Sequence, residues 1–438
     1  MGAIAQAVAA IIGDSGVMPW DAVQPQLHRE IQAAMVSPHG PDCVALPETA
    51  AALAEVMACA HHHRWRVLPM GNGSKIAWGG LVSGVDLVLS TARLNRVVEH
   101  AIGDLTLTVE AGTPFAAVQQ QLATTRQFLA LDPAYPQRAT LGGIVATADA
   151  GAWRQRYGGV RDRVIGVSFV RYDGQLAKAG GRVVKNVAGY DLMKLMTGAY
   201  GTLGILTQIT LRTYPMAAAA ATVLLTGNAA AIDQLAAAVR QSALTPVALD
   251  VLSPGLLQEM GYAPTYGLAL QLQGIAAGVE EQVDRLHALA APLAVTPQVF
   301  SDPAGATVWS AVQQCLWPPL PQDEWAIALK VGTQPTAAIT LLETLAASLP
   351  DGAWRGRIHG GSGIGTLRLQ TAAATAELLT SLRGQCQKHG GYLTLLEGPV
   401  VLKRAFEPWG IPADSQGLMQ RLHQPFDPHH NLSPGRFF

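Results

Sequence analysis

The chain has 438 residues, of which 14% are charged, and its formal net charge is −1. No basic stripe with interleaved aromatic residues occurs, so the sequence does not indicate nucleic-acid binding. The length predicts two or three domains. A charged share well below the roughly 25% of average soluble proteins indicates either a surface covered by a partner or a bias of the genome.

No apolar run approaches the roughly 18 residues that a membrane-spanning helix needs. The first residues also lack the basic start and apolar core of a signal peptide, so a cytoplasmic location is expected. Any membrane association would be peripheral and made through a complex. The four cysteines, Cys43, Cys59, Cys315 and Cys386, stand far apart. They cannot ligate an iron–sulfur cluster and are expected to be small core residues.

The first half of the chain predicts short strands, glycine-rich turns and a few helices. Residues 1–36 are expected to form an N-terminal helical segment, and residues 37–215 a first domain. A helix is predicted from Ala50 to His63, and its adjacent histidines point in different directions, which argues against a metal site. Strands are predicted at 66–70, 86–89, 105–110 and 164–172, and Asp173-Gly174 is a hairpin signal.

The sequence pattern changes after Pro215, and the second half predicts a cap domain over residues 216–424. Strands are expected at 221–225, 246–252, 266–273 and 294–299, with helices at 229–243 and 277–290. The same order then recurs, with strands at 325–331, 353–359, 364–370 and 391–397 and helices at 334–348 and 372–389. Each half is βαββαβ, the ferredoxin-like unit. Residues 301–323 are expected to be irregular, and the tail 425–438 to pack back on the first domain.

Three glycine-rich stretches mark a ligand site in the first half. They are Pro69 to Lys75, Ala139 to Gly151, and Lys185 to Ile205. Glycine permits a backbone turn with positive φ and a close approach to a ligand. Successive backbone N–H groups after a strand suit an anion such as a pyrophosphate. The first stretch is neither a Walker A loop nor a GxGxxG fingerprint, so the combination of the three carries the prediction.

The order of the motifs adds a resemblance to a known family. They are Pro69 to Ser74, Glu110-Ala111-Gly112, Asp132-Pro133, Ala139 to Gly143, Val160 to Gly166, and Lys185 to Gly204, with Phe426-Asp427-Pro428 and Pro434-Gly435-Arg436 near the end. This set resembles the flavoproteins of the vanillyl-alcohol oxidase/p-cresol methylhydroxylase (PCMH) type, and within them the FAD-binding subunits of bacterial glycolate oxidases. The family's closing motif has Asn where this chain has Ser433.

The resemblance implies an α+β fold with a two-subdomain PCMH-type FAD-binding domain, followed by an α+β cap of duplicated ferredoxin-like units. It also implies FAD as the cofactor. The residues expected to line it are Gly71, Asn72, Gly73, Ser74, Lys75, Asp132, Pro133, Thr140, Gly142, Gly143, Ala146, Ala150 and Ile205. Some relatives attach FAD through a histidine of the first loop. This chain has none between Pro69 and Gly80, so non-covalent FAD is expected.

The catalytic residues are less clear from the sequence. Related 2-hydroxy-acid dehydrogenases carry HxGDGNxH and Glu-His-Gly in the cap, a metal site that orients the hydroxy acid. Here His359 and Glu397 remain, while Ser362, Thr366 and Gly398 replace ligands. One His and one Glu are too few for a well-held divalent ion, so no metal is expected.

Two alternatives remain for these cap residues. His359 and Glu397 are either ordinary polar residues of cap strands or part of a metal-free catalytic site. In that site Arg357, His359 and Lys185 would supply positive charge, with Glu397 beside them.

The resemblance implies an FAD subunit of a glycolate oxidase complex that takes part in oxidising glycolate to glyoxylate. Its partners would be a catalytic flavoprotein subunit and an iron–sulfur subunit that receives the electrons. A stand-alone FAD dehydrogenase of a small 2-hydroxy acid such as D-lactate is the second possibility. A structural subunit that holds flavin weakly is the third, although the intact glycine loops argue against it.

Overall fold

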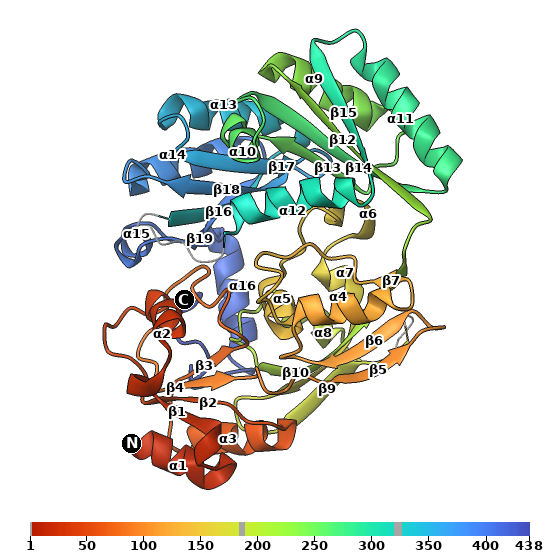
Figure 1. Cartoon of the computed structure of the whole chain (residues 1–438). Helices are drawn as coiled ribbons and strands as arrows, with labels where there is room; N and C mark the ends of the chain where they lie inside the picture. The colour runs from red at the N-terminus through yellow and green to blue at the C-terminus, as the bar shows by residue number, and fades with distance from the viewer. Residues whose placement is uncertain (1, 184–188, 319–325) are drawn as a thin grey trace. The chain divides into compact units, whose positions relative to one another are not determined.

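The computed structural model describes residues 2–183, 189–318 and 326–438, and these residues divide into two compact units (Figure 1). The first unit comprises Met1–Ala150, Gly158–Pro215 and Ile411–Phe438, and the second Gly151–Tyr157 and Met216–Gly410. Two segments therefore differ from the predicted domains. Residues 151–157 belong to the second unit, and residues 411–424 belong to the first.

The first unit contains two main sheets, each with its own core. The smaller sheet has the order β1-β2-β4-β3 and consists of β1 (Val17–Pro19), β2 (Cys43–Ala45), β4 (Leu87–Ser90) and β3 (Val67–Met70). The larger sheet has the order β5-β6-β10-β8-β9 and consists of β5 (Val97–Ala101), β6 (Thr106–Glu110), β10 (Ile205–Arg212), β8 (Val164–Val170) and β9 (Leu176–Gly180). β7 (Gln127–Phe128) pairs with β11 (Tyr214–Pro215). These two sheets are the two predicted subdomains.

Helices cover the two sheets. They are α1 (Ala3–Ile12), α2 (Pro25–Ala33), α3 (Ala50–His62), α4 (Phe115–Ala123), α5 (Leu141–Thr147), α7 (Val160–Arg163), α8 (Leu192–Met196) and α16 (Ala413–His423), with short 3₁₀ turns at Asp14–Gly16 and Trp20–Ala22. α3 buries Leu53, Val56 and Met57 against the smaller sheet, as their spacing predicts. The Asp173-Gly174 turn joins β8 to β9, so the hairpin prediction is confirmed.

Within the described residues, the second unit builds one sheet of eight strands in the order β15-β12-β14-β13-β17-β18-β16-β19. The strands of the first repeat are β12 (Ala219–Gly227), β13 (Ala248–Leu252), β14 (Tyr266–Gly274) and β15 (Val295–Ser301). Those of the second are β16 (Ala326–Gly332), β17 (Trp354–His359), β18 (Ile364–Gln370) and β19 (Tyr392–Glu397). Each repeat has its four strands in the same ferredoxin-like order. The repeats join through their second strands, β13 and β17, which pair antiparallel.

The two faces of this sheet differ. Its apolar face packs against α9 (Ala229–Gln241), α11 (Ala276–Ala290), α13 (Ala338–Ser348, preceded by a 3₁₀ turn at Pro335–Ala337) and α14 (Ala376–Lys388). The strands of this sheet also contact α6 (Arg154–Tyr157), α10 (Pro254–Glu259) and α12 (Ala304–Leu316). α15 (Val400–Ala405) follows β19. α12 corrects the expectation of irregular backbone over 301–323. The duplicated α+β cap is otherwise as predicted, and the fold class is confirmed.

Candidate functional site

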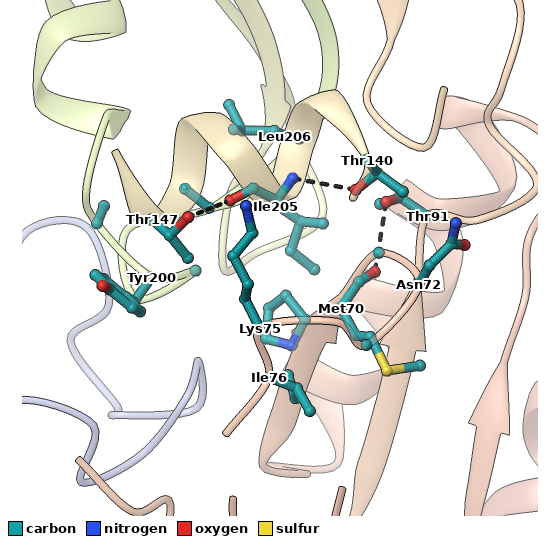
Figure 2. Close-up of a pocket in the computed structure, with 18 of the residues that line it drawn as sticks. Met70, Asn72, Lys75, Ile76, Thr91, Thr140, Thr147, Tyr200, Ile205 and Leu206 are labelled. Carbon is teal, nitrogen blue, oxygen red and sulfur yellow. Dashed lines mark hydrogen bonds between the residues drawn. The ribbon is translucent and has the colours of Figure 1, made fainter. Parts of the chain in front are cut away.

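A pocket in the first unit collects most of the predicted cofactor residues (Figure 2). Its empty space, including the open mouth, is about 820 Å³. The predicted residues that line it are Gly71, Asn72, Gly73, Ser74, Lys75, Thr140, Gly142, Gly143, Ala146 and Ile205. Figure 2 shows Asn72 and Lys75 of the loop after β3 with Thr140 and Thr147 of α5 around the same space.

The loop at residues 71–75 offers hydrogen-bond donors to a ligand. It begins where β3 ends, and the Thr91 N–H and the Ser90 hydroxyl donate to the carbonyls of Met70 (2.8 Å) and Gly71 (3.0 Å). Gly73 takes a φ of +78°, which glycine adopts without strain. Among the described residues, none accepts a hydrogen bond from the backbone N–H groups of residues 71 to 75. Successive free N–H groups form an anion-binding loop, which fits a pyrophosphate.

Gly142 and Gly143 both line the pocket at the start of α5, but they differ in what surrounds them. Thr140 caps α5, and its hydroxyl accepts the Gly143 N–H at 3.2 Å. The Gly142 N–H donates to the Ala111 carbonyl at 2.7 Å, and a Cβ on Gly142 would lie 2.8 Å from that oxygen. Gly142 is therefore required by packing inside the protein. A Cβ on Gly143 would meet only the Thr140 hydroxyl, so Gly143 is the glycine that leaves room for a ligand.

A buried ion pair lies at the same pocket. The Lys75 ammonium contacts an Asp149 carboxylate oxygen at 2.8 Å, and the Ala134 N–H donates to that oxygen at 2.8 Å. Burial lowers the pKa of Lys75 below its ordinary value, and Asp149 opposes this shift. The pair carries no net charge and fixes the Lys75 ammonium beside the loop at residues 71–75.

Three predicted cofactor residues do not line the pocket. Asp132 and Pro133 lie in the loop after β7, where the Asp132 N–H donates to the Ala150 carbonyl at 2.9 Å. Ala150 is buried in the core of the larger sheet. The hydrogen bond from Asp132 to Ala150 connects this loop to the segment that carries Asp149.

The sequence prediction missed part of the pocket wall. The missed residues are Pro69, Met70, Ile76, Thr91, Thr147, Met196, Ala199, Tyr200, Gly201, Gly204, Leu206 and Arg436. The N–H groups of Gly198 and Tyr200 donate to carbonyls of α5, at Val145 (3.0 Å) and Ala146 (2.9 Å), which closes the pocket floor. The Gly198 to Gly204 cluster was the available signal for these residues, although only Ile205 was drawn from it.

Arg436 is the most distant of these residues in sequence. It is 3% exposed and donates to the carbonyls of Ile76, Trp78 and Gly80 at 2.7 to 3.0 Å. Burial lowers its pKa to about 10, so it remains charged at neutral pH. The closing Pro434-Gly435-Arg436 motif thus ties the end of the chain to the loop of the pocket.

The second unit assembles a separate polar cluster on its sheet. His359 of β17 lies opposite Asp250 of β13, and its Nδ1 is 2.5 Å from a carboxylate oxygen of Asp250. Arg357 lies 3.8 Å from the other oxygen. Burial by itself raises the pKa of Asp250, but the charge and hydrogen bond of His359 and the charge of Arg357 outweigh it and leave the pKa below its ordinary value. The sequence prediction named His359 and Arg357 but missed Asp250.

Glu397 of β19 forms an ion pair of its own in this sheet. Its carboxylate pairs with Arg368, which is fully buried, at 2.6 Å. Lys185, the fourth predicted catalytic residue, lies outside the described residues. Among the residues that the structure describes, no group of three or more His, Cys, Asp and Glu side chains is placed to hold a metal ion. No helix in this part of the chain is long and apolar enough to cross a membrane.

Comparison with known proteins indicates which cofactor the chain uses. Residues 41–180 match the family model described as an FAD binding domain. This chain is a flavoprotein with FAD as its cofactor. The match contains the loop at 71–75 and α5, whose free donors and open glycine fit the pyrophosphate of that cofactor. The FAD prediction is confirmed, while the non-covalent attachment stays a prediction.

Three relatives define how far the likeness extends. The chain is 25% identical to glycolate oxidase subunit GlcD of Bacillus subtilis (strain 168) over 418 residues, which covers 91% of this chain and 89% of that subunit. It is 39% identical to glycolate oxidase subunit GlcE of Escherichia coli (strain K12) over 146 residues, or 33% of this chain and 41% of that subunit. The structure of p-cresol methylhydroxylase with substrate bound superposes with a TM-score of 0.76 at 14% identity, covering 99% and 96% of the two chains.

The likeness to p-cresol methylhydroxylase shows the fold alone, and the family match supports an FAD-dependent oxidoreductase. The likeness to GlcE is higher in identity but confined to a third of this chain. The likeness to GlcD is lower in identity but nearly complete.

Proposed function

We propose that this chain is the FAD subunit of a glycolate oxidase-type complex that oxidises a small 2-hydroxy acid, glycolate to glyoxylate. The observation that carries the proposal is the pocket of the first unit, whose loop at 71–75 has unused N–H groups. Two of the relatives reported above are named as glycolate oxidase subunits, which supports the substrate class and the complex. The four cysteines are far apart in the sequence, so electron transfer to a cluster would need an iron–sulfur partner.

In this proposal the first unit holds the cofactor by backbone donors. The N–H groups of residues 71–75 would bind the pyrophosphate, with Gly143 and Thr140 on the α5 side and Ile205 and Leu206 supplying apolar surface. FAD, when bound, supplies the oxidant that takes up two electrons from the hydroxy acid. No histidine occurs between Pro69 and Gly80, so the attachment is expected to be non-covalent.

The cap cluster would provide the contacts to the acid. Arg357 carries a charge suited to a carboxylate, and His359 can accept a proton from a hydroxyl group. Lys185 is proposed as a further positive group. Glu397, which pairs with Arg368, is proposed to act by fixing that arginine. This arrangement needs no metal ion to orient the acid.

The visible spectrum of the purified chain tests the proposal. We expect a yellow protein that releases FAD into the supernatant on acid precipitation. Glycolate and D-lactate would each be added in rapid mixing, with and without zinc or manganese. They would be added first to the chain alone and then to the chain with its partner subunits. Bleaching of the flavin band by glycolate in the assembled complex, without added metal, is the expected result.

Other outcomes select other functions. Rapid bleaching of the isolated chain would favour a stand-alone dehydrogenase, which the buried Asp250, His359 and Arg357 cluster also permits. Bleaching that depends on added metal would mean that further residues complete a metal site. A colourless protein that takes up no FAD would leave a structural subunit. No bleaching by any 2-hydroxy acid in any assembly would overturn the proposal.

A further inference from the structure

The cap cluster contains one residue that the proposed function leaves without a role, Asp250. It is fully buried in β13, directly opposite His359 across the seam between the two repeats. We propose that Asp250 is a positioning residue that keeps a proton on Nδ1 of His359, so that Nε2 is the atom that accepts the hydroxyl proton of the substrate. This inference rests on the proposed function, because it assigns the proton acceptor for hydroxy-acid oxidation.

The direction of the hydrogen bond between His359 and Asp250 follows from the charge of Asp250. An ionised carboxylate can only accept hydrogen bonds. Arg357, 2% exposed and 3.8 Å from the second oxygen of Asp250, favours the ionised form. Nδ1 of His359, 2.5 Å from the first oxygen, must therefore be the donor. A neutral imidazole with its proton on Nδ1 has a lone pair on Nε2.

The Nε2 atom of His359 must be able to meet a bound molecule. His359 is 5% exposed, and its hydrogen bond to Asp250 uses Nδ1. Within the described ranges, no hydrogen bond involves its Nε2. His359 Nε2 is not among the buried side-chain atoms that lack a partner, so solvent or a bound molecule can reach it. The geometry therefore points to Nε2 as a contact for a bound molecule.

Hydrogen bonds on both sides of the Asp250–His359 pair hold its two strands in place. On one side of the pair, Ser253 and Gly356 exchange two hydrogen bonds, from the Ser253 N–H to the Gly356 carbonyl and from the Gly356 N–H to the Ser253 hydroxyl, both at 2.9 Å. On the other side the Gly360 N–H donates to the Leu249 carbonyl at 2.6 Å. Asp250 and His359 therefore lie on paired strands that are hydrogen-bonded on both sides of the pair. Such strands hold a catalytic geometry better than a loop does.

The reaction balances with these groups. The hydroxyl oxygen gives its proton to Nε2 of His359, the hydrogen on C2 leaves with its electron pair to the oxidant, and the C–O bond becomes a carbonyl. His359 becomes positively charged, and Asp250 stabilises that charge across the short hydrogen bond. The competing explanation is a structural cross-strand pair with no part in proton transfer.

Asp250→Asn separates the two explanations, with Asp284→Asn on the surface of α11 as the matched control. Nitrogen NMR of ¹⁵N-histidine-labelled flavoprotein, with the His359 signal assigned through His359→Gln, reports which ring nitrogen carries the proton. We expect Nδ1 in the wild-type chain, a mixture of tautomers in Asp250→Asn, and no change in Asp284→Asn. A proton on Nε2 in the wild-type chain, or an unchanged tautomer in Asp250→Asn, would overturn the proposal.

Flavin reduction by glycolate in the assembled complex gives the functional readout. Asp250→Asn should lower the limiting rate by about 10²- to 10⁴-fold, the range of general-base catalysis, while the apparent dissociation constant for glycolate stays within about threefold. His359→Gln should lower the rate similarly, and the double variant no further. Unchanged rates with normal flavin content would show a structural pair. If the wild-type complex does not reduce its flavin, the proposed function fails, and the tautomer measurement still judges the Asp250–His359 pair.

Discussion

The pocket of the first unit and the polar cluster of the cap are built in opposite ways. The pocket of the first unit uses backbone N–H groups and glycines whose positions are set by short stretches of chain. The cluster of the second unit uses side chains from β13 and β17, which lie more than 100 residues apart and meet through strand register. A backbone-built site leaves a local trace in the sequence, whereas a side-chain site made by register leaves almost none.

The largest expected effect tests whether the pocket depends on open space at Gly143. Gly143→Val places a branched side chain in the pocket, where Thr140 is the nearest protein neighbour. FAD binding should weaken at least about tenfold, equivalent to about 1.4 kcal/mol. Flavin content after purification and titration of the apoprotein with FAD measure the loss.

Gly103→Val is the matched control for this variant. Gly103 has no heavy atom within 4 Å of an added Cβ and lies in the turn between β5 and β6. Equal flavin content in the two variants would contradict the assignment of Gly143 to the cofactor site.

The neighbouring glycine should respond differently. Gly142→Ala brings a Cβ within 2.8 Å of the Ala111 carbonyl oxygen, a contact inside the protein. The free energy of unfolding should fall by about 1–3 kcal/mol, the range for overpacked interiors. Denaturant titration of the apoprotein measures it, with Gly103→Ala as the reference. A Gly142→Ala apoprotein as stable as the wild type would mean that the helix moves away from Ala111 at little cost.

Two threonine caps allow the same change in both units. Thr140 caps α5 at the pocket, and Thr375 caps α14 in the cap sheet. Loss of either hydroxyl by substitution to alanine should cost about 1 kcal/mol of stability. Thr140→Ala should also weaken FAD binding, because the Thr140 side chain lines the pocket, while Thr375→Ala should leave FAD binding unchanged. A fall in flavin affinity in both variants would show that the effect comes from general destabilisation.

The smallest effect concerns acid and the cap cluster. The folded-state pKa of Asp250 is lower than its ordinary value of 3.8, so the folded state binds that proton less tightly than the unfolded state. Its contribution to stability is therefore complete above pH 3.8 and is lost as the pH falls below it. Asp250→Asn should flatten the acid dependence of the unfolding free energy in that range. Denaturant titrations from pH 5 downward, set beside Asp284→Asn, measure the difference, and parallel curves would contradict it.

Local patterns predicted most of the fold. The alternating strands and amphipathic helices of both cap repeats were placed close to their observed bounds, because each hydrophobic period is set by one buried face. α12 was missed because Pro303 and Pro318 flank it and suggested irregular backbone, although its interior contains no proline. The two segments exchanged between the units were missed because contacts, rather than composition, decide which unit they join.

The site divides along the same line. The glycines at 71–75 and Gly143 predicted the pocket from the sequence. Arg436 was recognised as part of a motif, but its position in the pocket wall was not predicted. Asp250 could not be selected from the sequence, since an isolated aspartate in an apolar strand gives no sign of its partner. The pairing of Asp250 with His359 follows only from the joining of the two repeats through β13 and β17.

The division of the chain also bears on how the protein is made. The backbone passes from one unit to the other four times, and residues 411–438 complete the first unit. The N–H of Val67 donates to the Asn431 carbonyl, so β3, which leads into the pocket loop, gains a neighbour from the last part of the chain. During synthesis the cofactor pocket is therefore finished only after the whole cap has emerged from the ribosome. Truncation within residues 411–438 should yield chains that form the cap sheet but mature poorly as flavoproteins.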